Sequence, residues 1–410
     1  MNCRHCGAPL KHCFLDLGFA PPSNGYRKEV ELRSPESHYP LRLFVCANCW
    51  LVQTEDYSSA SDLFTEDYAY FSSVSKSWLS HAENYATIIT KRLSLDESSF
   101  VMEVASNDGY LLKNFVRFGI PCVGIEPTAS TASVAVGNGI ATIREFFGEQ
   151  LATNLAASGK RADLIVGNNV FAHVPDINDF TRGLRVALKK SGTITLEFPH
   201  ILELMRNVQF DTVYHEHFSY LSLFSAQRIF EAAGLRIYDV ERLKTHGGSL
   251  RVFGCHFDAA YKTSDAVLDV LNDETSSGLQ DLGVYLNFQA KAAAVKNEFL
   301  RFLIEQRLQR NKVAGYGAAA KGVTLLNYAG VKPDLLPFVC DAAPSKQGKY
   351  LPGCHLPIVH PDRLLTERPK YIVIFPWNIL EEVQNQLAYI KEWNGTLVTA
   401  TPTVKLFNPL

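Results

Sequence analysis

Two Cys-x-x-Cys pairs near the N-terminus limit most strongly what this chain can fold into. Cys3 and Cys6 form one pair and Cys46 and Cys49 form the other. Two such turns can supply the four thiolates of a tetrahedral zinc site, and four thiolates leave no coordination position for a catalytic water. The sequence therefore predicts one structural zinc ion bound by these cysteines. Three neighbouring residues are alternative ligands: His5, His12 and Cys13.

Composition limits the kinds of partner and the cellular compartment that we expect for this protein. The chain has 410 residues, 40 Lys and Arg against 42 Asp and Glu, and 47% hydrophobic residues. This near-neutral balance disfavours broad nucleic-acid binding, which needs a basic surface. No apolar run approaches the roughly 18 residues of a membrane span, and the first residues lack an apolar signal region. We expect a monomeric cytoplasmic protein of two or three domains, with no nucleic-acid or membrane partner.

The centre of the chain has the pattern of a nucleotide-binding α/β fold. A short apolar run at residues 100–106 leads into the small-residue turn 103–109 and a helix-like stretch at 110–118, which is the first unit of such a fold. The turn is not Gly-x-Gly-x-x-Gly, so a nicotinamide dinucleotide is disfavoured. The next predicted strand, 122–125, ends in Glu126. A carboxylate at that place can accept hydrogen bonds from both hydroxyls of a ribose.

Later strand candidates favour a methyltransferase sheet. They cover residues 163–170, 192–198, 236–243 and 249–257, and the last two are too close for a crossover helix, so we expect an antiparallel pair at a sheet edge. Together these features indicate S-adenosylmethionine as the cofactor, with His173 beside it. The predicted cofactor-binding residues are Glu103, Ser106, Asn107, Gly109, Glu126, Asn168 and Asn169.

The densest polar cluster spans residues 211–220, where a methyltransferase active site would open. It contains Tyr214-His215-Glu216-His217, and imidazole titrates near neutral pH, so a histidine oriented by a carboxylate suits a general base. His-Glu-His is not His-Glu-x-x-His, so a zinc protease is not supported. The alternative is a polar helix start. A Gly-rich turn at 245–251 could face an anion through its backbone N–H groups and Arg251, or could be a plain hairpin turn.

These motifs resemble the nucleotide-sugar C-methyltransferases of deoxysugar pathways, which build branched sugars such as mycarose, tetronitrose and noviose. The resemblance runs nearly end to end, and the Tyr-His-Glu-His and His-Gly-Gly-Ser motifs are specific in combination. Ala105 replaces the usual Gly of the cofactor turn. Besides the paired cysteines, the motifs that carry the resemblance lie at residues 70–73, 103–109, 214–217, 246–249 and 315–322.

The resemblance and the pattern together divide the chain into three parts. They are a zinc-binding module (1–66), a Rossmann-like class I methyltransferase domain (67–258) and a smaller C-terminal α/β Rossmann-like domain (259–410). The last part has helical residues 264–310, strand candidates at 312–316, 337–340 and 370–375, and a small-residue turn suited to phosphate. By resemblance it anchors the nucleotide diphosphate, with Tyr316, Lys321 and Asp341 as contacts and Lys346 as added positive charge.

The implied reaction is methylation of a ring carbon, C-3 favoured over C-5, of a dTDP- or GDP-linked 4-keto-6-deoxyhexose through an enolate. His217 is then the base, Glu216 sets its tautomer or pKa, Tyr214 donates to the oxyanion, and His215 is the alternative base. The remaining predicted substrate contacts are Tyr70, His215, His246 and Arg251. Two other functions fit the sequence: a methyltransferase acting on oxygen or nitrogen, and a zinc-ribbon binding protein without catalysis.

Overall fold

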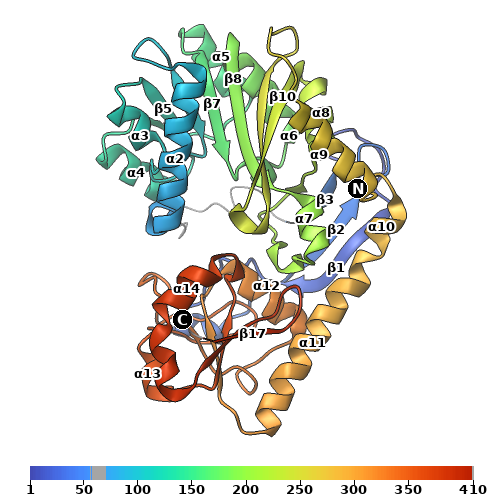
Figure 1. Ribbon diagram of the computed structural model, residues 1–410, viewed down its shortest axis with the longest axis vertical. Helices are drawn as coiled ribbons and strands as arrows, with labels where there is room; N and C mark the ends of the chain where they lie inside the picture. Colours follow the sequence, from blue (N-terminus) through green and yellow to red (C-terminus); the bar gives the residue numbers. More distant parts are fainter. Residues whose placement is uncertain (56, 58–70, 409–410) are drawn as a thin grey trace.

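A seven-stranded sheet forms the upper part of the protein (Figure 1). The structure is a computed structural model that describes residues 1–55, 57 and 71–408. The strand order is β10-β11-β8-β7-β4-β5-β6. The strands are β4 (Val101–Val104), β5 (Cys122–Ile125), β6 (Thr142–Ile143), β7 (Ala162–Asn168), β8 (Leu188–Pro199), β10 (Leu235–Leu243) and β11 (Ser249–His256).

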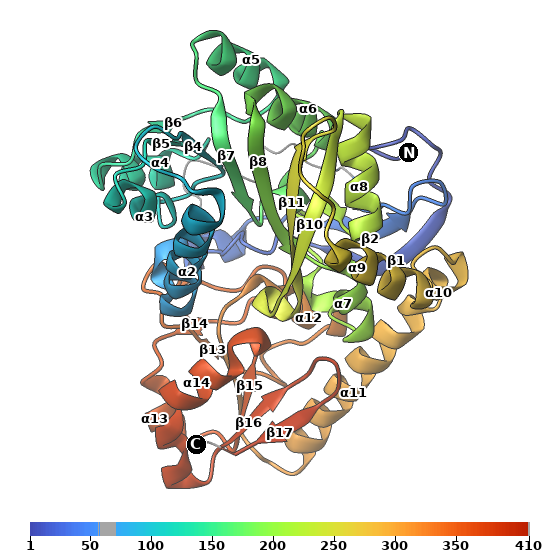
Figure 2. The same ribbon diagram turned by 45° about the horizontal axis from the view of Figure 1, so that its top comes forward.

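The pairing of this sheet confirms the mixed topology expected from the sequence. Strands β8, β7, β4, β5 and β6 are parallel, whereas β10 and β11 form an antiparallel pair at the edge beside β8. Parallel strands need helices on both faces, and Figure 2 shows α2 and α3 on one side and α5, α6 and α8 on the other. The helices are α2 (Lys76–Leu93), α3 (Leu112–Arg117), α4 (Ala129–Gly137), α5 (Glu149–Ala157), α6 (Ile177–Ala187), α7 (Ile201–Arg206) and α8 (Leu223–Ala232).

The N-terminal segment forms a four-stranded sheet that the sequence did not predict. Its order is β1-β2-β3-β9, with β1 (His12–Ala20), β2 (Tyr39–Val45) and β3 (Val52–Thr54) from the first 54 residues. The last strand, β9 (Ser219–Tyr220), comes from the middle of the chain. It follows the Tyr-His-Glu-His motif directly, so the N-terminal sheet fixes one end of that loop.

A second α/β sheet forms the lower part (Figure 1). Its order is β14-β13-β12-β15-β16-β17, and all pairs except the last are parallel. The elements are β12 (Val313–Tyr316), α12 (Ala320–Ala329), β13 (Val339–Cys340), β14 (Ile358–Val359), α13 (Arg363–Glu367), β15 (Tyr371–Ile374), α14 (Leu380–Gln386), β16 (Thr396–Thr399) and β17 (Lys405–Phe407). Three of these strands were expected. β14, β16 and β17 have only two to four residues and were not.

Three helices connect the two sheets: α9 (Asp265–Ser276), α10 (Leu282–Leu286) and α11 (Phe288–Leu308). They agree with the helical stretch expected at 264–310. Figure 1 shows α11 passing beside the N-terminal strands toward the lower sheet. Phe14 stacks on Phe288 with ring centroids 4.8 Å apart, and Trp50 stacks on Tyr285 at 5.9 Å. These aromatic contacts join the N-terminal sheet to the connecting helices.

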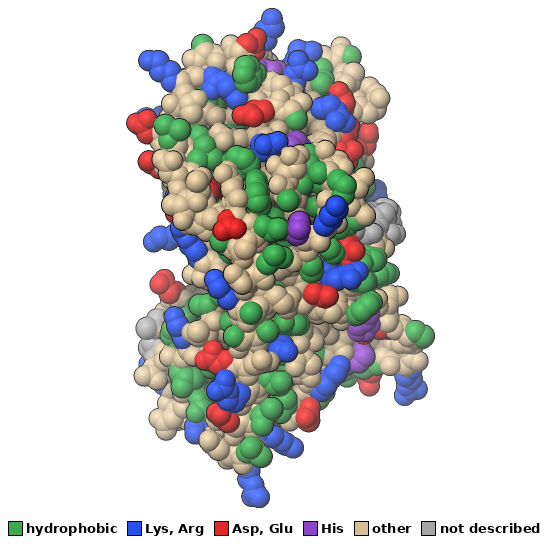
Figure 3. Space-filling model, turned by 90° about the vertical axis from the view of Figure 1, so that its right-hand side faces the viewer, with side chains coloured by type: hydrophobic (Ala, Val, Ile, Leu, Met, Phe, Trp, Pro, Cys, Tyr) green, Lys and Arg blue, Asp and Glu red, His purple; other side chains and the backbone are tan. Residues whose placement is uncertain are grey.

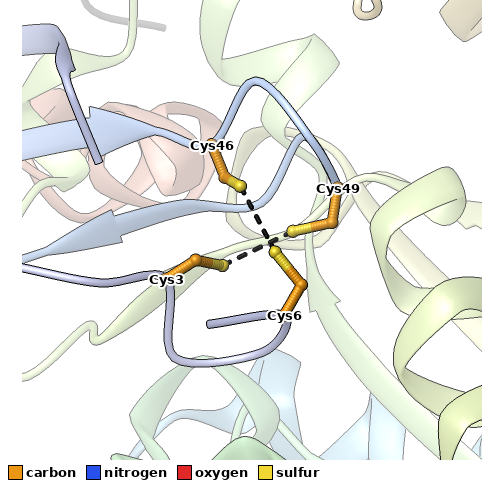
Figure 4. A group of neighbouring side chains, drawn as sticks. All are labelled: Cys3, Cys6, Cys46 and Cys49. Atoms are coloured by element: carbon orange, nitrogen blue, oxygen red, sulfur yellow. Dashed lines mark hydrogen bonds between the residues drawn. The ribbon is translucent and has the colours of Figure 1, made fainter. Parts of the chain in front are cut away.

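The four predicted zinc ligands lie together, as Figure 4 shows. Their Sγ atoms are all within 4.8 Å of one another, with Cys3 and Cys49 3.4 Å apart and Cys6 and Cys46 3.5 Å apart. A tetrahedral ion with Zn–S bonds of about 2.3 Å needs sulfurs about 3.8 Å apart, so the cluster fits zinc. The three alternative ligands do not belong to the cluster. His5 binds Asn178 instead, at 2.9 Å.

One face of the protein carries mixed charge. On the face shown in Figure 3, basic and acidic side chains are interspersed. Among the residues that the structure describes, no helix is both long and apolar enough to cross a membrane.

Purified protein should contain one zinc ion per chain. Cys49→Ser should lose the ion and lower the thermal midpoint by about 6–12 °C, because losing roughly 3 kcal/mol shifts a domain of this size by ~2–4 °C per kcal/mol. Metal analysis and thermal unfolding measure both effects. The exposed Cys13 supplies the control, since Cys13→Ser should keep the ion. Zinc-free wild-type protein, or zinc retained in Cys49→Ser, would contradict the assignment.

Candidate functional site

A cavity of about 630 Å³ lies where the three sheets meet. The arrowheads of β7 and β8 point toward the lower sheet (Figure 1), so the carboxyl ends of the central strands open into this region. The lining comes from all three parts: the N-terminal module contributes Asn24 and Tyr26, the central sheet contributes its cofactor turn, and the lower sheet contributes Lys321 and Lys346. Residues from all three parts of the chain therefore surround one cavity.

The cofactor end of the cavity is built around Glu126. Its carboxylate follows β5, lines the cavity and is 5% exposed. Its two oxygens accept hydrogen bonds from the backbone N–H groups of Asn107 and Thr128, each at 2.9 Å. These bonds tie the turn after β4 to the end of β5, and they aim the carboxylate at the place where a ribose would lie.

Asn168 and Asn169 follow β7 and line the same end. Both side-chain atoms of Asn168 are buried without a hydrogen-bond partner among the described residues. Buried polar groups are normally paired, so unpaired amide atoms facing a cavity indicate a place for a polar ligand. With Glu126 they fit the amino-acid and ribose groups of S-adenosylmethionine.

Three other predicted cofactor residues belong to the turn 103–109 and do not line the cavity. Glu103 on β4 is 1% exposed, and burial, together with Glu126 and Asp108, raises its pKa well above the usual range. Ser106 is fully buried. Gly109 has φ +77°, and a Cβ there would lie 2.8 Å from Ile140. These residues shape the turn. Ala105, in place of the usual Gly, adopts φ +57° and lines the cavity.

His217 has the geometry of a general base. Its Nδ1 lies 3.1 Å from the carbonyl oxygen of Thr212. A carbonyl only accepts, so Nδ1 carries the proton and Nε2 presents its lone pair. Burial lowers the pKa of His217 well below 6.5, and His173 and His246 lower it further, so the ring is neutral at pH 7. Thr212 sets the tautomer, and the expected role of Glu216 in this is wrong.

His173 and His246 flank His217. The rings of His173 and His217 are 4.6 Å apart, and Nδ1 of His173 donates to the carbonyl of Glu216 at 2.9 Å. Nε2 of His246 lies 3.1 Å from the amide nitrogen of Asn169. Burial lowers the pKa of His173 and of His246 to about 4 each. The three rings are therefore neutral together, which a buried cluster of imidazoles requires.

Tyr214 and Glu216 complete the reaction end. Burial raises the pKa of Tyr214 well above 10, so its phenol keeps its proton and can donate a hydrogen bond to an oxyanion. The rings of Tyr214 and His217 are 4.7 Å apart. The carboxylate of Glu216 accepts from the amide of Asn24 at 2.9 and 3.1 Å.

Two lysines, Lys321 and Lys346, line the cavity, and each has a carboxylate near it, Asp211 and Asp341 respectively. Burial lowers the pKa of Lys321 to about 8, so it remains mostly charged at pH 7. Its ammonium group donates to Asn378 at 2.7 Å and lies 5.0 Å from the ring centre of Trp377. Lys346 donates to the carbonyl of Ala318 at 2.9 Å and forms an ion pair with Asp341 at 3.5 Å. Both lysines line the cavity beside the first residues of α12, and a helix N-terminus with two lysines suits a phosphate.

Four other predicted substrate residues, all among the described residues, do not line the cavity. His215 binds the carbonyl of Tyr39 at 3.3 Å. Arg251 is paired with Glu197 at 2.8 Å and with Glu241. The remaining two support the lower sheet: Tyr316 binds Gln386, and Asp341 accepts from the N–H groups of Ala318 and Ala343. Tyr70 lies outside the described residues.

Sequence reasoning missed Asn24 and Tyr26. They belong to Pro-Pro-Ser-Asn-Gly-Tyr at residues 21–26, which has the composition of a turn. A turn motif gives no signal of the distant cavity that its side chains reach.

Three family models match consecutive parts of the chain. They are described as a zinc binding domain (residues 3–64), a methyltransferase domain (78–240) and a C-methyltransferase C-terminal domain (244–402). The C-methyltransferase NovU of Streptomyces niveus is 32% identical over 408 residues, which cover 99% of this chain and 97% of that protein. The chain belongs to the zinc-containing C-methyltransferases. It is an S-adenosylmethionine-dependent enzyme, which sets aside the zinc-ribbon protein without catalysis.

Solved methyltransferase structures are similar to parts of this C-methyltransferase. Magnesium protoporphyrin IX methyltransferase of Synechocystis, with bound S-adenosylmethionine, is 12% identical and covers 43% of this chain and 79% of its own, with a TM-score of 0.34. The CcbJ methyltransferase of Streptomyces caelestis is 14% identical and covers 44% and 90%, also with a TM-score of 0.34.

Glu126→Gln should raise the dissociation constant of S-adenosylmethionine about tenfold or more, because a charge-assisted pair of hydrogen bonds contributes roughly 1.5–3 kcal/mol. Isothermal titration calorimetry measures this without a second substrate. Glu149→Gln is the control, because Glu149 forms an exposed ion pair with Arg182 away from the ribose position. An unchanged constant in Glu126→Gln would refute the role of Glu126.

Proposed function

We propose that this C-methyltransferase methylates a ring carbon, C-3 favoured over C-5, of a dTDP- or GDP-linked 4-keto-6-deoxyhexose. The observation that carries the proposal is the single cavity, which joins the cofactor turn to His217 and Tyr214 and then to two lysines at the start of α12. A methyltransferase for a small neutral acceptor would not need the two lysines that line this cavity. The similarity to NovU, named a C-methyltransferase, agrees with carbon as the acceptor.

Carbon beside a ketone becomes nucleophilic when it loses a proton. His217 Nε2 takes that proton, the C–H bond breaks, and its electron pair delocalises onto the ketone oxygen. Tyr214 donates a hydrogen bond to this oxygen and stabilises the enolate. His217 can act because Thr212 holds its proton on Nδ1 and because its ring is neutral at pH 7.

S-adenosylmethionine, when bound, supplies an electrophilic methyl group on sulfur. Glu126, Asn107, Asn168 and Asn169 would hold it at the carboxyl ends of β4, β5 and β7. Lys321 and Lys346 would pair with the diphosphate of the substrate, and this holds the hexose between the two ends of the cavity. Trp377 donates a hydrogen bond to the carboxylate of Asp211 at 2.7 Å. This carboxylate lies close enough to Lys321 to favour its charged form.

The test uses dTDP- and GDP-4-keto-6-deoxyhexoses with S-adenosylmethionine. Mass spectrometry should show a gain of one methyl group, and NMR should place it on carbon. In deuterated water without cofactor, the enzyme should also exchange the proton beside the ketone. A product methylated on oxygen, or no product from either nucleotide series, would contradict the proposal.

His217→Ala should lower both the exchange rate and methyl transfer by about 10²–10⁴-fold, the usual cost of removing a general base, while cofactor binding stays normal. His215→Ala is the matched control, because His215 faces Tyr39 and not the cavity. If His215→Ala abolishes exchange and His217→Ala does not, the two roles are reversed.

A further inference from the structure

One loop of the N-terminal module reaches the reaction end of the cavity. It follows β1, and its Asn24 and Tyr26 line the cavity. Tyr26 donates its hydroxyl hydrogen to the carbonyl of Ala318 at 2.7 Å. The backbone of Arg27 pairs with that of Tyr350 in both directions, at 2.9 and 2.8 Å. The loop is therefore held by the lower sheet on one side, which fixes where Asn24 can lie.

The amide of Asn24 has a defined partner. Its Nδ2 lies 2.9 Å from Oε1 and 3.1 Å from Oε2 of Glu216, and Glu216 is only 4% exposed. A buried carboxylate without a cationic partner is costly unless donors satisfy it. Asn24 is the donor that the structure provides for this carboxylate.

We propose that Asn24 is a positioning residue that favours the ionised form of Glu216 and aims its carboxylate into the cavity, where Glu216 accepts a hydrogen bond from a hydroxyl of the substrate sugar. This assignment rests on the proposed function. It gives the zinc-binding module a direct part in sugar recognition, beyond its structural metal.

The surroundings of Glu216 support this role. Burial raises its pKa to about 7, and the hydrogen bond from Asn24 opposes the rise. The groups that face it are Tyr26 from the loop, Tyr214 from its own segment, and His173, whose ring binds the Glu216 carbonyl. From the lower sheet, Lys346 and Asp341 lie beside Tyr26. Glu216 is therefore half ionised near neutral pH, and the ionised share increases as pH rises.

The first measurement needs no sugar. In protein labelled with ¹⁵N-asparagine, the side-chain amide of Asn24, identified by its loss in Asn24→Ala, should shift with a midpoint near pH 7. Glu216→Gln should abolish that shift, and Arg27→Ala should keep it, because Arg27 joins the lower sheet through its backbone only. If the Asn24 amide signal is the same in the wild type and in Glu216→Gln across about pH 5.5–8.5, the assignment is overturned even if the substrate class is wrong.

The second measurement follows methyl transfer against pH. Asn24→Ala and the isosteric Asn24→Asp should move the acid limb upward by about half a pH unit or more, since each removes one charge-assisted hydrogen bond to the ionised form. Asn24→Asp should move it further, because it places a second carboxylate against Glu216. Zinc content and the dissociation constant of S-adenosylmethionine should stay at wild-type values. If the wild type turns over the substrate but the acid limb of the pH profile is unchanged in both variants, the role of Asn24 is refuted and the proposed substrate stands. If the wild type shows no turnover, the proposed substrate is refuted.

Discussion

The pairing of β9 with β3 is the constraint on which the site depends. Val52 pairs with Tyr220 and Gln53 with Ser219, only three and four residues after Cys49. The hydroxyl of Thr54 also donates to the carbonyl of His217 at 3.3 Å. The strand next to the zinc cluster thus pairs with the strand that follows the Tyr-His-Glu-His loop. A two-residue strand such as β9 is not stable alone, so the position of the proposed base, His217, depends on the sheet that carries the metal site.

The first Cys-x-x-Cys turn also joins the segment around His217 to the central domain. Arg4 donates to the carbonyl of Pro175 at 2.7 Å and to that of Thr54 at 3.3 Å, and it lies 5.4 Å from the ring centre of Phe218. These contacts connect the segment after His173 with the segment after His217. The N-terminal segment therefore contacts the chain next to both histidines, although none of the four cysteines lines the cavity.

The sequence predicts the local features and not the long-range ones. Cysteine spacing gives the four ligands, and apolar runs give the central strands, because each depends on neighbouring residues. The N-terminal sheet escapes prediction because β9 lies more than 160 residues from β3. The group that fixes the tautomer of His217 could not be predicted for another reason. It is the backbone carbonyl of Thr212, and every residue carries such a group. Glu216 was assigned to His217 from adjacency, yet its side chain faces Asn24.

A single cavity is proposed to hold the cofactor, the sugar and the nucleotide diphosphate in a row. A crystal structure with S-adenosylhomocysteine and a dTDP- or GDP-linked 4-keto-6-deoxyhexose tests this most directly. We expect the carbon beside the ketone at about 3–3.5 Å from Nε2 of His217, its ketone oxygen on Tyr214, and the diphosphate on Lys321 and Lys346. A sugar bound away from His217, or a diphosphate outside the start of α12, would contradict the account.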